Sequence, residues 1–267
     1  MSKLRDPVTG CPWDREQTFA SIAPYTIEEV YEVVDAIERN SMTELKDELG
    51  DLLFQIVFYA QIAKEKDLFN FDAVVDNIVA KMKNRHPHVF GDMDIKTAEE
   101  QTALWEKIKS EERQKSRDSS DRKSSPHSVI EDVPKTLPGL TRAFKLHKKA
   151  ARVGFDWDDI SGVMEKIDEE IKEIQHEIDN GLNHHRMEDE IGDLLFVTTI
   201  LARHAKVDPE TAIRHANRKF ERRFSRVEAL LAEEKINIVD ASLEKMDALW
   251  DVAKQEEKST DTDRKGA

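Results

Sequence analysis

The amino-acid sequence predicts an all-α protein that consists of two tandem copies of one helical bundle. Glycine and proline are scarce, with nine and eight among 267 residues, and 36% of the residues are charged; this composition favours long helices with polar faces. Apolar residues recur at steps of three and four positions in both halves, as on one face of a helix. An eight-residue run of the first half also returns almost unchanged in the second. At about 150 residues per domain, the length fits roughly two domains.

The repeat comprises three blocks of sequence that occur twice in the same order. The run DELGDLLF at positions 47–54 returns as DEIGDLLF at positions 189–196, with one conservative difference. The acidic run at positions 28–32 matches positions 169–173, and the pair Leu-Trp at 104–105 matches the pair at 249–250. Because the blocks keep nearly the same offset, we interpret the chain as a tandem duplication, with a period too long for a solenoid repeat.

The two copies are separated by a segment that cannot form a core. Positions 113–128 contain five Arg or Lys, six Ser, two Asp and no apolar residue, so burial cannot offset the conformational entropy lost on ordering them. We therefore expect an N-terminal domain at residues 1–112, a disordered linker at 113–128 and a C-terminal domain at 129–257. The tail at 258–267 is expected to be disordered in the same way.

Each half is expected to contain an amphipathic helix followed by a strongly apolar one. The apolar helices, at residues 45–63 and 191–204, are apolar nearly all round in their central turns, which predicts deep burial between helices or across a subunit interface. Asn180-Gly181 marks a break after the first helix of the second half. Further helices are predicted at 71–84, 99–111, 208–234 and 242–257, and no run shows the alternation typical of a strand. The amphipathic helices are indicated by Ile27, Val30, Val34 and Ile37 in the first half and by Met164, Ile167, Ile171, Ile174 and Ile178 in the second.

Charge and cysteine content exclude several classes of function. A formal net charge of −14 argues against a sequence-blind nucleic-acid binder, which needs a basic surface. The single cysteine, Cys11, excludes a disulfide framework and a four-thiolate metal site. The longest apolar run, at residues 52–63, is too short to span a bilayer, and no secretory signal is visible, so we expect a cytoplasmic protein with no membrane partner. The sequence contains neither a glycine-rich phosphate loop nor the HExxH zinc motif.

Acidic residues of the C-terminal half are spaced so that they converge. Glu170 and Glu173 are three positions apart, as are Glu190 and Asp193, and this spacing places each pair on one helical face. Most such pairs are solvated surface, but Glu190 and Asp193 lie in one of the most apolar helices, where unpaired acids are costly. Four convergent carboxylates suit Mg²⁺, with Mn²⁺ as the alternative ion, and Glu169 could hold a further ion or act as a base toward water. The N-terminal half repeats the set with Glu28, Glu29, Glu32, Glu48 and Asp51.

Basic residues of the C-terminal half suit a polyphosphate substrate, because a metal ion neutralises only part of its charge and Lys or Arg can bind the rest. Trp250 either stacks on a base or belongs to the core. The N-terminal half lacks three of these groups and has Tyr25, Glu44 and Val79 in their places. We therefore expect the principal active site in the C-terminal half, while turnover in the N-terminal half stays open. The candidate substrate-binding set is Lys166, Arg186, Asn217, Lys219, Arg223, Trp250 and Lys254.

The doubled pattern EExxE followed by ExxD resembles the tandem-domain type of the MazG nucleoside triphosphate pyrophosphohydrolases. Flanking segments are similar too, namely CPWD at 11–14, RHPHVFG at 85–91, GFDW at 154–157 and KFERRF at 219–224. The resemblance covers almost the whole chain except the linker and tail. It implies an all-α, Mg²⁺-dependent homodimer that hydrolyses NTPs and dNTPs to the monophosphate and pyrophosphate. It also implies a housekeeping role, either the removal of non-standard nucleotides or the control of nucleotide pools.

The resemblance assigns roles to individual residues. Glu169 would place or deprotonate the attacking water, and Trp250 would contact the nucleoside end. Arg186 stands where the family often has Lys, so the charge is kept while the geometry differs. Mg²⁺ would be bound by Glu170, Glu173, Glu190 and Asp193, and the phosphates by Lys166, Arg186, Lys219, Arg223 and Lys254.

Two other classes of function remain open at this point. A regulator that binds nucleotide or protein without catalysis would keep the fold and use the acids for a structural metal ion. A di-iron carboxylate oxidoreductase would need two ExxH motifs, whereas the chain has one, formed by Glu173 and His176.

Overall fold

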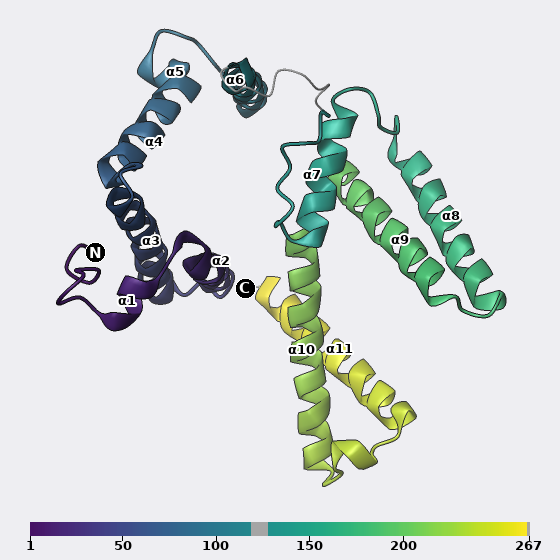
Figure 1. Ribbon diagram of the computed structural model, residues 1–267. Helices are drawn as coiled ribbons and strands as arrows, with labels where there is room; N and C mark the ends of the chain where they lie inside the picture. Colours follow the sequence, from purple (N-terminus) through teal and green to yellow (C-terminus); the bar gives the residue numbers. More distant parts are fainter. Residues whose placement is uncertain (119–127, 266–267) are drawn as a thin grey trace. The chain divides into compact units, whose positions relative to one another are not determined.

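The computed structural model describes residues 1–118 and 128–265, and in these ranges helices are the regular secondary structure (Figure 1). The chain divides into two compact units, Met1–Ser124 and Ser125–Ala267. Within the described ranges, no helix is long and apolar enough to cross a membrane. Because helices are the regular secondary structure in these ranges, the all-α prediction is confirmed for this part of the chain.

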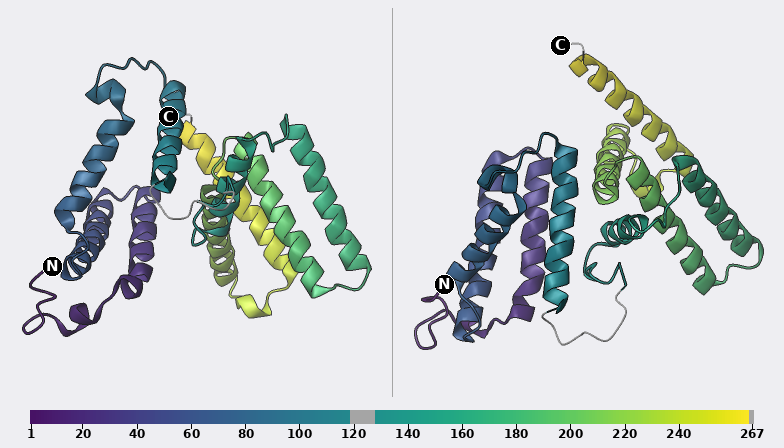
Figure 2. Two further views of the ribbon diagram at one scale, coloured as in Figure 1. Left: turned by 45° about the horizontal axis from the view of Figure 1, so that its top comes forward. Right: turned by 90° about the horizontal axis from the view of Figure 1, so that it is seen from above.

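The first unit is built around a helical hairpin. The helices α2 and α3 lie side by side (Figure 2). In addition, α4 packs on α3, and α6 packs on α4. Its core cluster consists of Ile22, Phe58 and Ile62, on which Phe19 and Tyr59 pack. The helices are α1 (Pro12–Glu16), α2 (Phe19–Glu38), α3 (Met42–Glu65), α4 (Phe71–Arg85), α5 (Pro87–Phe90) and α6 (Ala98–Asp118).

The second unit repeats the hairpin as α8 and α9, with α7 packed on α9 and on α10 (Figure 1). One core cluster, of Val163, Val197 and Ile200, joins α8 to α9, and a second joins α10 to α11. The elements are α7 (Gly139–Ala151), α8 (Ile160–Asp179), α9 (His184–His204), α10 (Pro209–Glu233), the short 3₁₀ helix η1 (Ile238–Asp240) and α11 (Leu243–Lys265).

Side-chain caps fix the ends of the two hairpin helices in the second unit. Asp159 accepts hydrogen bonds from the backbone N–H groups of Ser161 and Gly162 at the start of α8, and Asn183 caps α9 in the same way. Gly181 adopts a φ of +98° just after α8, a conformation that glycine reaches without steric cost. The predicted break at Asn180-Gly181 is therefore where the chain turns back.

Gly162 gives the fold a stability prediction of its own. A Cβ at this position would lie 2.5 Å from Cδ1 of Trp157, which packs against the core cluster of Val163, Val197 and Ile200. We expect Gly162→Ala to lower the free energy of unfolding by about 1–3 kcal/mol, because crowding a packed ring outweighs the gain in helix propensity. Urea denaturation would measure it. Gly139→Ala is the matched control, since its Cβ meets nothing within 4 Å, and an equal change in both variants would contradict the packing argument.

Two segments that were expected to be disordered are partly helical. The helix α6 continues to Asp118 and α11 continues to Lys265, so the predicted linker and tail each begin inside a helix, at residues 113–118 and 258–265. Neither stretch contains Gly or Pro, and extending an existing helix costs far less than starting one. The rest of the predicted linker, apart from Ser128, and residues 266–267 lie outside the described ranges.

The strongly apolar helices are buried over only part of their length within one chain. Phe58 and Ile62 of α3 are buried, but Leu53 is 52% exposed; in α9 Ile200 is buried, while Leu195 is likewise 52% exposed. Within one chain, the expected deep burial is therefore not found in the first half of each helix, and burial of this part across a subunit interface stays a prediction. Among the described elements, α3 is packed by α2 and α4, and α9 by α8, α7 and α10, and these contacts cover mainly the later turns of each helix.

Candidate metal and nucleotide site

Three carboxylates of the second unit converge between the two helices of the hairpin. Glu170 on α8 and Glu190 and Asp193 on α9 each offer an oxygen that lies within 4.8 Å of the other two. Glu170 is only 2% exposed, and its Oε2 is buried without a hydrogen-bond partner. A buried carboxylate oxygen without a partner is costly unless a cation or donor meets it. We call Glu170, Glu173, Glu190 and Asp193 the C-terminal acidic cluster.

Glu173 belongs to this cluster by its electrostatics. Desolvation and the neighbouring carboxylates of Glu170 and Glu190 raise the pKa of Glu173 above its ordinary value. A carboxylate whose pKa is raised by neighbouring carboxylates is stabilised as an anion by a cation placed among them. Because every donor of the cluster is a carboxylate oxygen, the set fits a hard divalent ion such as Mg²⁺ or Mn²⁺.

Lys166 lies directly beside the C-terminal acidic cluster. Its Nζ is 2.7 Å from Glu170 and 2.8 Å from Glu169, and these two carboxylates raise the pKa of Lys166 above its ordinary range. Glu169, the candidate base, thus contacts the Lys166 ammonium group, and its side chain is more than half exposed to solvent. Lys166 and Glu169 thus lie where the spacing of α8 predicts, at the edge of the cluster.

Arg186, a candidate for phosphate binding, pairs with a buried carboxylate of α8. Its guanidinium lies 3.3 Å from Oε1 of Glu177, and Glu177 is 7% exposed. Glu177 comes one turn after Glu173 on α8, so Arg186 balances a buried carboxylate beside the cluster. The Arg186 side chain is itself 68% exposed, which leaves part of the guanidinium open to solvent.

The other substrate-binding candidates lie on α10 and α11. Arg223 is paired with Glu257 at 2.8 Å, and its guanidinium carbon is 5.8 Å from the centre of the Trp250 ring. Lys254 is paired with Asp251 at 2.6 Å, while Asn217 and Lys219 are exposed on α10. Among the described residues, no ion pair or hydrogen bond joins this group to the C-terminal acidic cluster.

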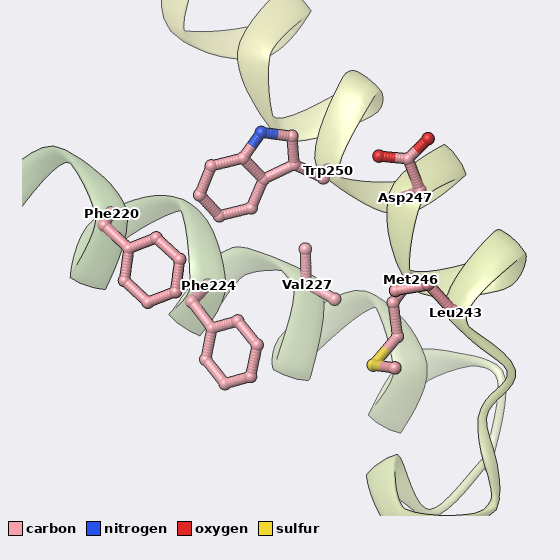
Figure 3. Close-up of a pocket in the computed structure, with 7 residues that line it drawn as sticks. All are labelled: Phe220, Phe224, Val227, Leu243, Met246, Asp247 and Trp250. Atoms are coloured by element: carbon pink, nitrogen blue, oxygen red, sulfur yellow. The ribbon is translucent and has the colours of Figure 1, made fainter. Parts of the chain in front are cut away.

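Trp250 lines an apolar groove between α10 and α11 (Figure 3). The rings of Phe220 and Trp250 are 5.3 Å apart and those of Phe220 and Phe224 are 5.7 Å apart. Trp250 is half-buried and also packs on the core cluster around Leu249, so its ring serves both the core and the groove. The groove has a volume of about 270 Å³ and is lined by Phe220, Phe224, Val227, Leu243, Met246, Asp247 and Trp250.

The first unit contains a second acidic set in the equivalent place. Glu29 on α2 and Glu48 and Asp51 on α3 each offer an oxygen within 4.8 Å of the other two. Desolvation raises the pKa of both Glu29 and Glu48, and the charges of Asp51 and Glu32 add to this effect. We call Glu29, Glu32, Glu48 and Asp51 the N-terminal acidic cluster; Glu28 lies beside it on α2 and acts on Glu29 through its charge.

In the first unit, too, an arginine pairs with a glutamate outside the acidic cluster. Arg85 on α4 is 2.6 Å from Glu112 on α6, as Arg223 on α10 pairs with Glu257 on α11. The Nζ of Lys109 lies 3.9 Å from the centre of the Trp105 ring. The aromatic candidate of each unit therefore lies with nearby basic residues, namely Trp250 with Arg223 in the second unit and Trp105 with Lys109 in the first. Lys166 and Arg186 are different, because they lie beside α8 and its acids.

Three residues near the site, Phe220, Phe224 and Gln55, are not among the candidates named from the sequence. Phe220 and Phe224 are four residues apart and therefore face the same way on α10, a spacing that could have revealed the groove. Gln55 is buried beside Glu29, with Nε2 3.5 Å from the Glu29 Oε1. Its only signal is a polar residue inside an apolar run.

Comparison with known proteins places the chain in a family. Residues 17–90 and 159–227 match the model of the MazG nucleotide pyrophosphohydrolase domain, so the domain occurs twice. A nucleoside triphosphate pyrophosphohydrolase of Escherichia coli K12 is 46% identical over 258 residues, which are 96% of this chain and 95% of that protein. A nucleoside triphosphate pyrophosphohydrolase/pyrophosphatase of Thermotoga maritima is 41% identical over 254 residues, covering 95% of this chain and 92% of that protein. With its doubled domain and two acidic clusters, this chain belongs to the MazG family.

Proposed function

We propose that this protein hydrolyses nucleoside triphosphates to the monophosphate and pyrophosphate, by attack of water on the α-phosphorus, at the C-terminal acidic cluster. The observation that carries the proposal is the convergence of Glu170, Glu190 and Asp193 around a buried carboxylate oxygen without a partner. The names of the relatives and the matched family support the same activity. A housekeeping role in the cytoplasm fits a strongly acidic chain that does not attract nucleic acid.

Mg²⁺ is the proposed metal, with Mn²⁺ as a substitute, and the C-terminal acidic cluster would hold it. When bound, the metal ion would neutralise part of the phosphate charge and polarise the phosphoryl oxygens. Without a cation, four carboxylates would repel a triphosphate at close range. The N-terminal acidic cluster is proposed to hold a cation in the same way.

The residues around the cluster are proposed to prepare water and phosphates for the reaction. Glu169 accepts a proton from the attacking water at a carboxylate oxygen, because it is exposed and adjacent to the cluster. Lys166 keeps Glu169 and Glu170 in place before the nucleotide arrives. Arg186 is proposed to reach the phosphates with the part of its guanidinium that is exposed.

The nucleoside end is proposed to bind at the groove between α10 and α11. Trp250 and Phe220 offer aromatic faces for a base, and Arg223 lies beside the Trp250 ring. Asn217, Lys219 and Lys254 would then contact the phosphates or sugar from the same pair of helices. Binding would thus join two groups of residues between which the described part of the chain forms no ion pair or hydrogen bond.

The activity can be tested by identifying the products. Purified protein with Mg²⁺ and a mixture of the common NTPs and dNTPs should yield nucleoside monophosphate and pyrophosphate in equal amounts, as resolved by anion-exchange chromatography. Nucleoside diphosphate with orthophosphate would contradict the proposal, since those products require attack on the γ-phosphorus. Saturable nucleotide binding with no product at any metal concentration would instead favour a non-catalytic regulator.

A homodimer is proposed because the hairpin helices expose apolar side chains in both units. In α8 and α9, Ile171, Ile191 and Leu195 are each about half exposed, and in α3 so are Leu49 and Leu53. Contiguous apolar faces of this kind are rarely left open to water in soluble proteins. Two hairpins that face each other would bury these side chains in a four-helix arrangement.

We expect the double variant Leu53→Glu, Leu195→Glu to be monomeric. Placing a carboxylate in each apolar face would force the burial of an unpaired charge on association, which costs several kcal/mol. Light scattering coupled to size exclusion should give twice the 30.8 kDa chain mass for the unmodified protein and the single mass for the variant. Exchange of the exposed Val239, which is outside the hairpins, for Glu is the control. An unmodified protein that is monomeric at micromolar concentration would contradict the dimer.

A further inference from the structure

Glu257 of α11 holds two neighbouring arginines of α10. Its Oε2 accepts a hydrogen bond from Nε of Arg223 at 2.8 Å, and its Oε1 accepts one from Nε of Arg222 at 2.6 Å. The side chains of Glu257 and Arg223 are 25% and 20% exposed, whereas that of Arg222 is 63% exposed. Burial alone would raise the pKa of Glu257, but the hydrogen bonds from the two arginines bring this pKa below its ordinary value. Glu257 is therefore an anion at neutral pH, and its better shielded partner is Arg223.

The contact with Glu257 leaves most of the Arg223 guanidinium unused. A guanidinium carries five N–H donors in one plane, and Glu257 takes only the one on Nε. In the part of the chain that the structure describes, Arg223 donates no other hydrogen bond. Its guanidinium carbon lies 5.8 Å from the centre of the Trp250 ring, which lines the apolar groove between α10 and α11 (Figure 3). The two terminal NH₂ groups can thus bind an anion beside this groove, and a pair of such groups matches two phosphate oxygens.

The first unit contains the same pair with a different hydrogen-bond pattern. Glu112 stands at the position of Glu257 in the repeat. Arg85 donates to Glu112 from Nε and also from a terminal NH₂ group, the latter at 2.6 Å, and Asn84 donates to the same carboxylate at 3.2 Å. The pair in the first unit therefore uses a donor that Arg223 keeps available in the second unit.

We propose that Glu257 is a positioning residue for the nucleotide. By accepting the Nε hydrogen bond, it holds the Arg223 guanidinium beside the groove and leaves the two terminal NH₂ groups to donate to a phosphate. The proposal rests on the proposed function in taking the groove between α10 and α11 as part of the nucleotide site. It adds that an acidic residue, which does not itself contact the substrate, strengthens the binding of a polyanion.

Two physical effects of Glu257 have opposite signs. A long arginine side chain loses conformational freedom when it binds a phosphate, and this loss weakens binding unless the side chain is already held in place. The negative charge of Glu257 also repels the phosphates. If positioning is the larger effect, removal of Glu257 weakens nucleotide binding; if repulsion is larger, removal strengthens it. The sign of the change in affinity therefore decides between the two.

The test is calorimetric titration of the full chain with the α,β-methylene analogue of ATP, which is not cleaved at the α-phosphorus, in the presence of Mg²⁺. Glu257→Met should raise the Kd by about three- to tenfold, because Arg223 is then ordered only on binding. Glu257→Gln keeps an oxygen that can accept the Nε hydrogen bond, so its Kd should stay within about twofold of that of the unmodified protein. An unchanged or lower Kd in Glu257→Met, or an equal rise in both variants, would overturn the proposal.

A double-mutant cycle tests whether Glu257 acts through Arg223. Arg223→Met should weaken binding of the analogue, and adding Glu257→Met should then raise the Kd by no more than about twofold. Fully additive losses would overturn the proposal. Glu256→Met is the matched control, because it removes the adjacent carboxylate and its ion pair with Arg226 at 2.7 Å and should leave the Kd unchanged. A loss equal to that of Glu257→Met would show a general effect on α11 and would also overturn the proposal.

The same samples separate this inference from the proposed function. Circular dichroism melting shows that each variant is folded, and product analysis shows whether the unmodified protein hydrolyses NTPs. Hydrolysis by the unmodified protein with an unchanged Kd in Glu257→Met refutes only the positioning role. Weaker binding of the analogue by Glu257→Met without any hydrolysis refutes only the proposed activity.

Discussion

Glu173→Gln and Asp193→Asn should each lose nearly all nucleotide hydrolysis, whereas Glu32→Gln should lose much less. Glu173 and Asp193 belong to the cluster that is flanked by Lys166, Glu169 and Arg186. Replacing a carboxylate by its isosteric amide removes one charge from the metal site and several kcal/mol of stabilisation of the developing phosphate charge. At about 1.4 kcal/mol per tenfold change, we expect kcat/KM to fall by at least about a hundredfold.

Glu32→Gln is the matched control, because Glu32 stands at the position of Glu173 in the repeat. The first unit has Tyr25 at the position of Lys166 in the repeat, so it lacks a group that is proposed to act beside the metal site. Steady-state rates of pyrophosphate release would measure all three variants. Equal losses in Glu32→Gln and Glu173→Gln would show that the choice of the second unit as the principal site is wrong.

Removal of divalent cations should abolish turnover completely, and Mg²⁺ or Mn²⁺ should restore it. The reason is electrostatic, because the substrate is a polyanion and the proposed site consists of carboxylates. Pyrophosphate release would be followed in excess chelator and then after stepwise addition of metal. Undiminished turnover in chelator would contradict the role of the acidic clusters, and restoration by iron alone would point to the di-iron alternative.

Most helices follow from periodicity in the sequence, but α7 does not. The isoleucines of α8 recur at steps of three and four residues. Asp159 caps the start of this helix, and Gly181 follows its end, as expected for residues of these types. In α7 the buried residue is His147, whose ring stacks on Trp157 at a distance of 6.0 Å. A search for periodic apolar residues does not detect a buried histidine, because the burial of that side chain depends on a partner from another segment.

The acidic clusters could be predicted because each depends on two local spacings. Glu170 and Asp193 come from pairs three residues apart, and a short turn that joins α8 to α9 brings the two pairs together. The partners of Arg186 and Arg223 could not be predicted, because Glu177 and Glu257 become neighbours only when the helices pack. Local spacing thus fixes which side chains share a face, and packing between helices decides which charges meet.

The same limit applies to the two segments that the sequence predicted to be disordered. Polar composition predicts residues that bury little surface, but it does not tell where a helix that has already formed will stop. The helix α6 extends to Asp118 and α11 to Lys265, since no Gly or Pro interrupts either stretch. An exposed helix needs no apolar face for its last turns when the preceding turns are packed.

The central claim is that water attacks the α-phosphorus, and isotope labelling tests it most directly. A single turnover of nucleoside triphosphate in ¹⁸O-labelled water, with Mg²⁺, would be analysed by mass spectrometry of the products. The new bond joins the water oxygen to the α-phosphorus while the bond from that phosphorus to the bridging oxygen breaks, so pyrophosphate leaves with its original oxygens. We therefore predict one ¹⁸O atom in the nucleoside monophosphate and none in pyrophosphate. Label in pyrophosphate, or in orthophosphate released with a diphosphate, would contradict the account.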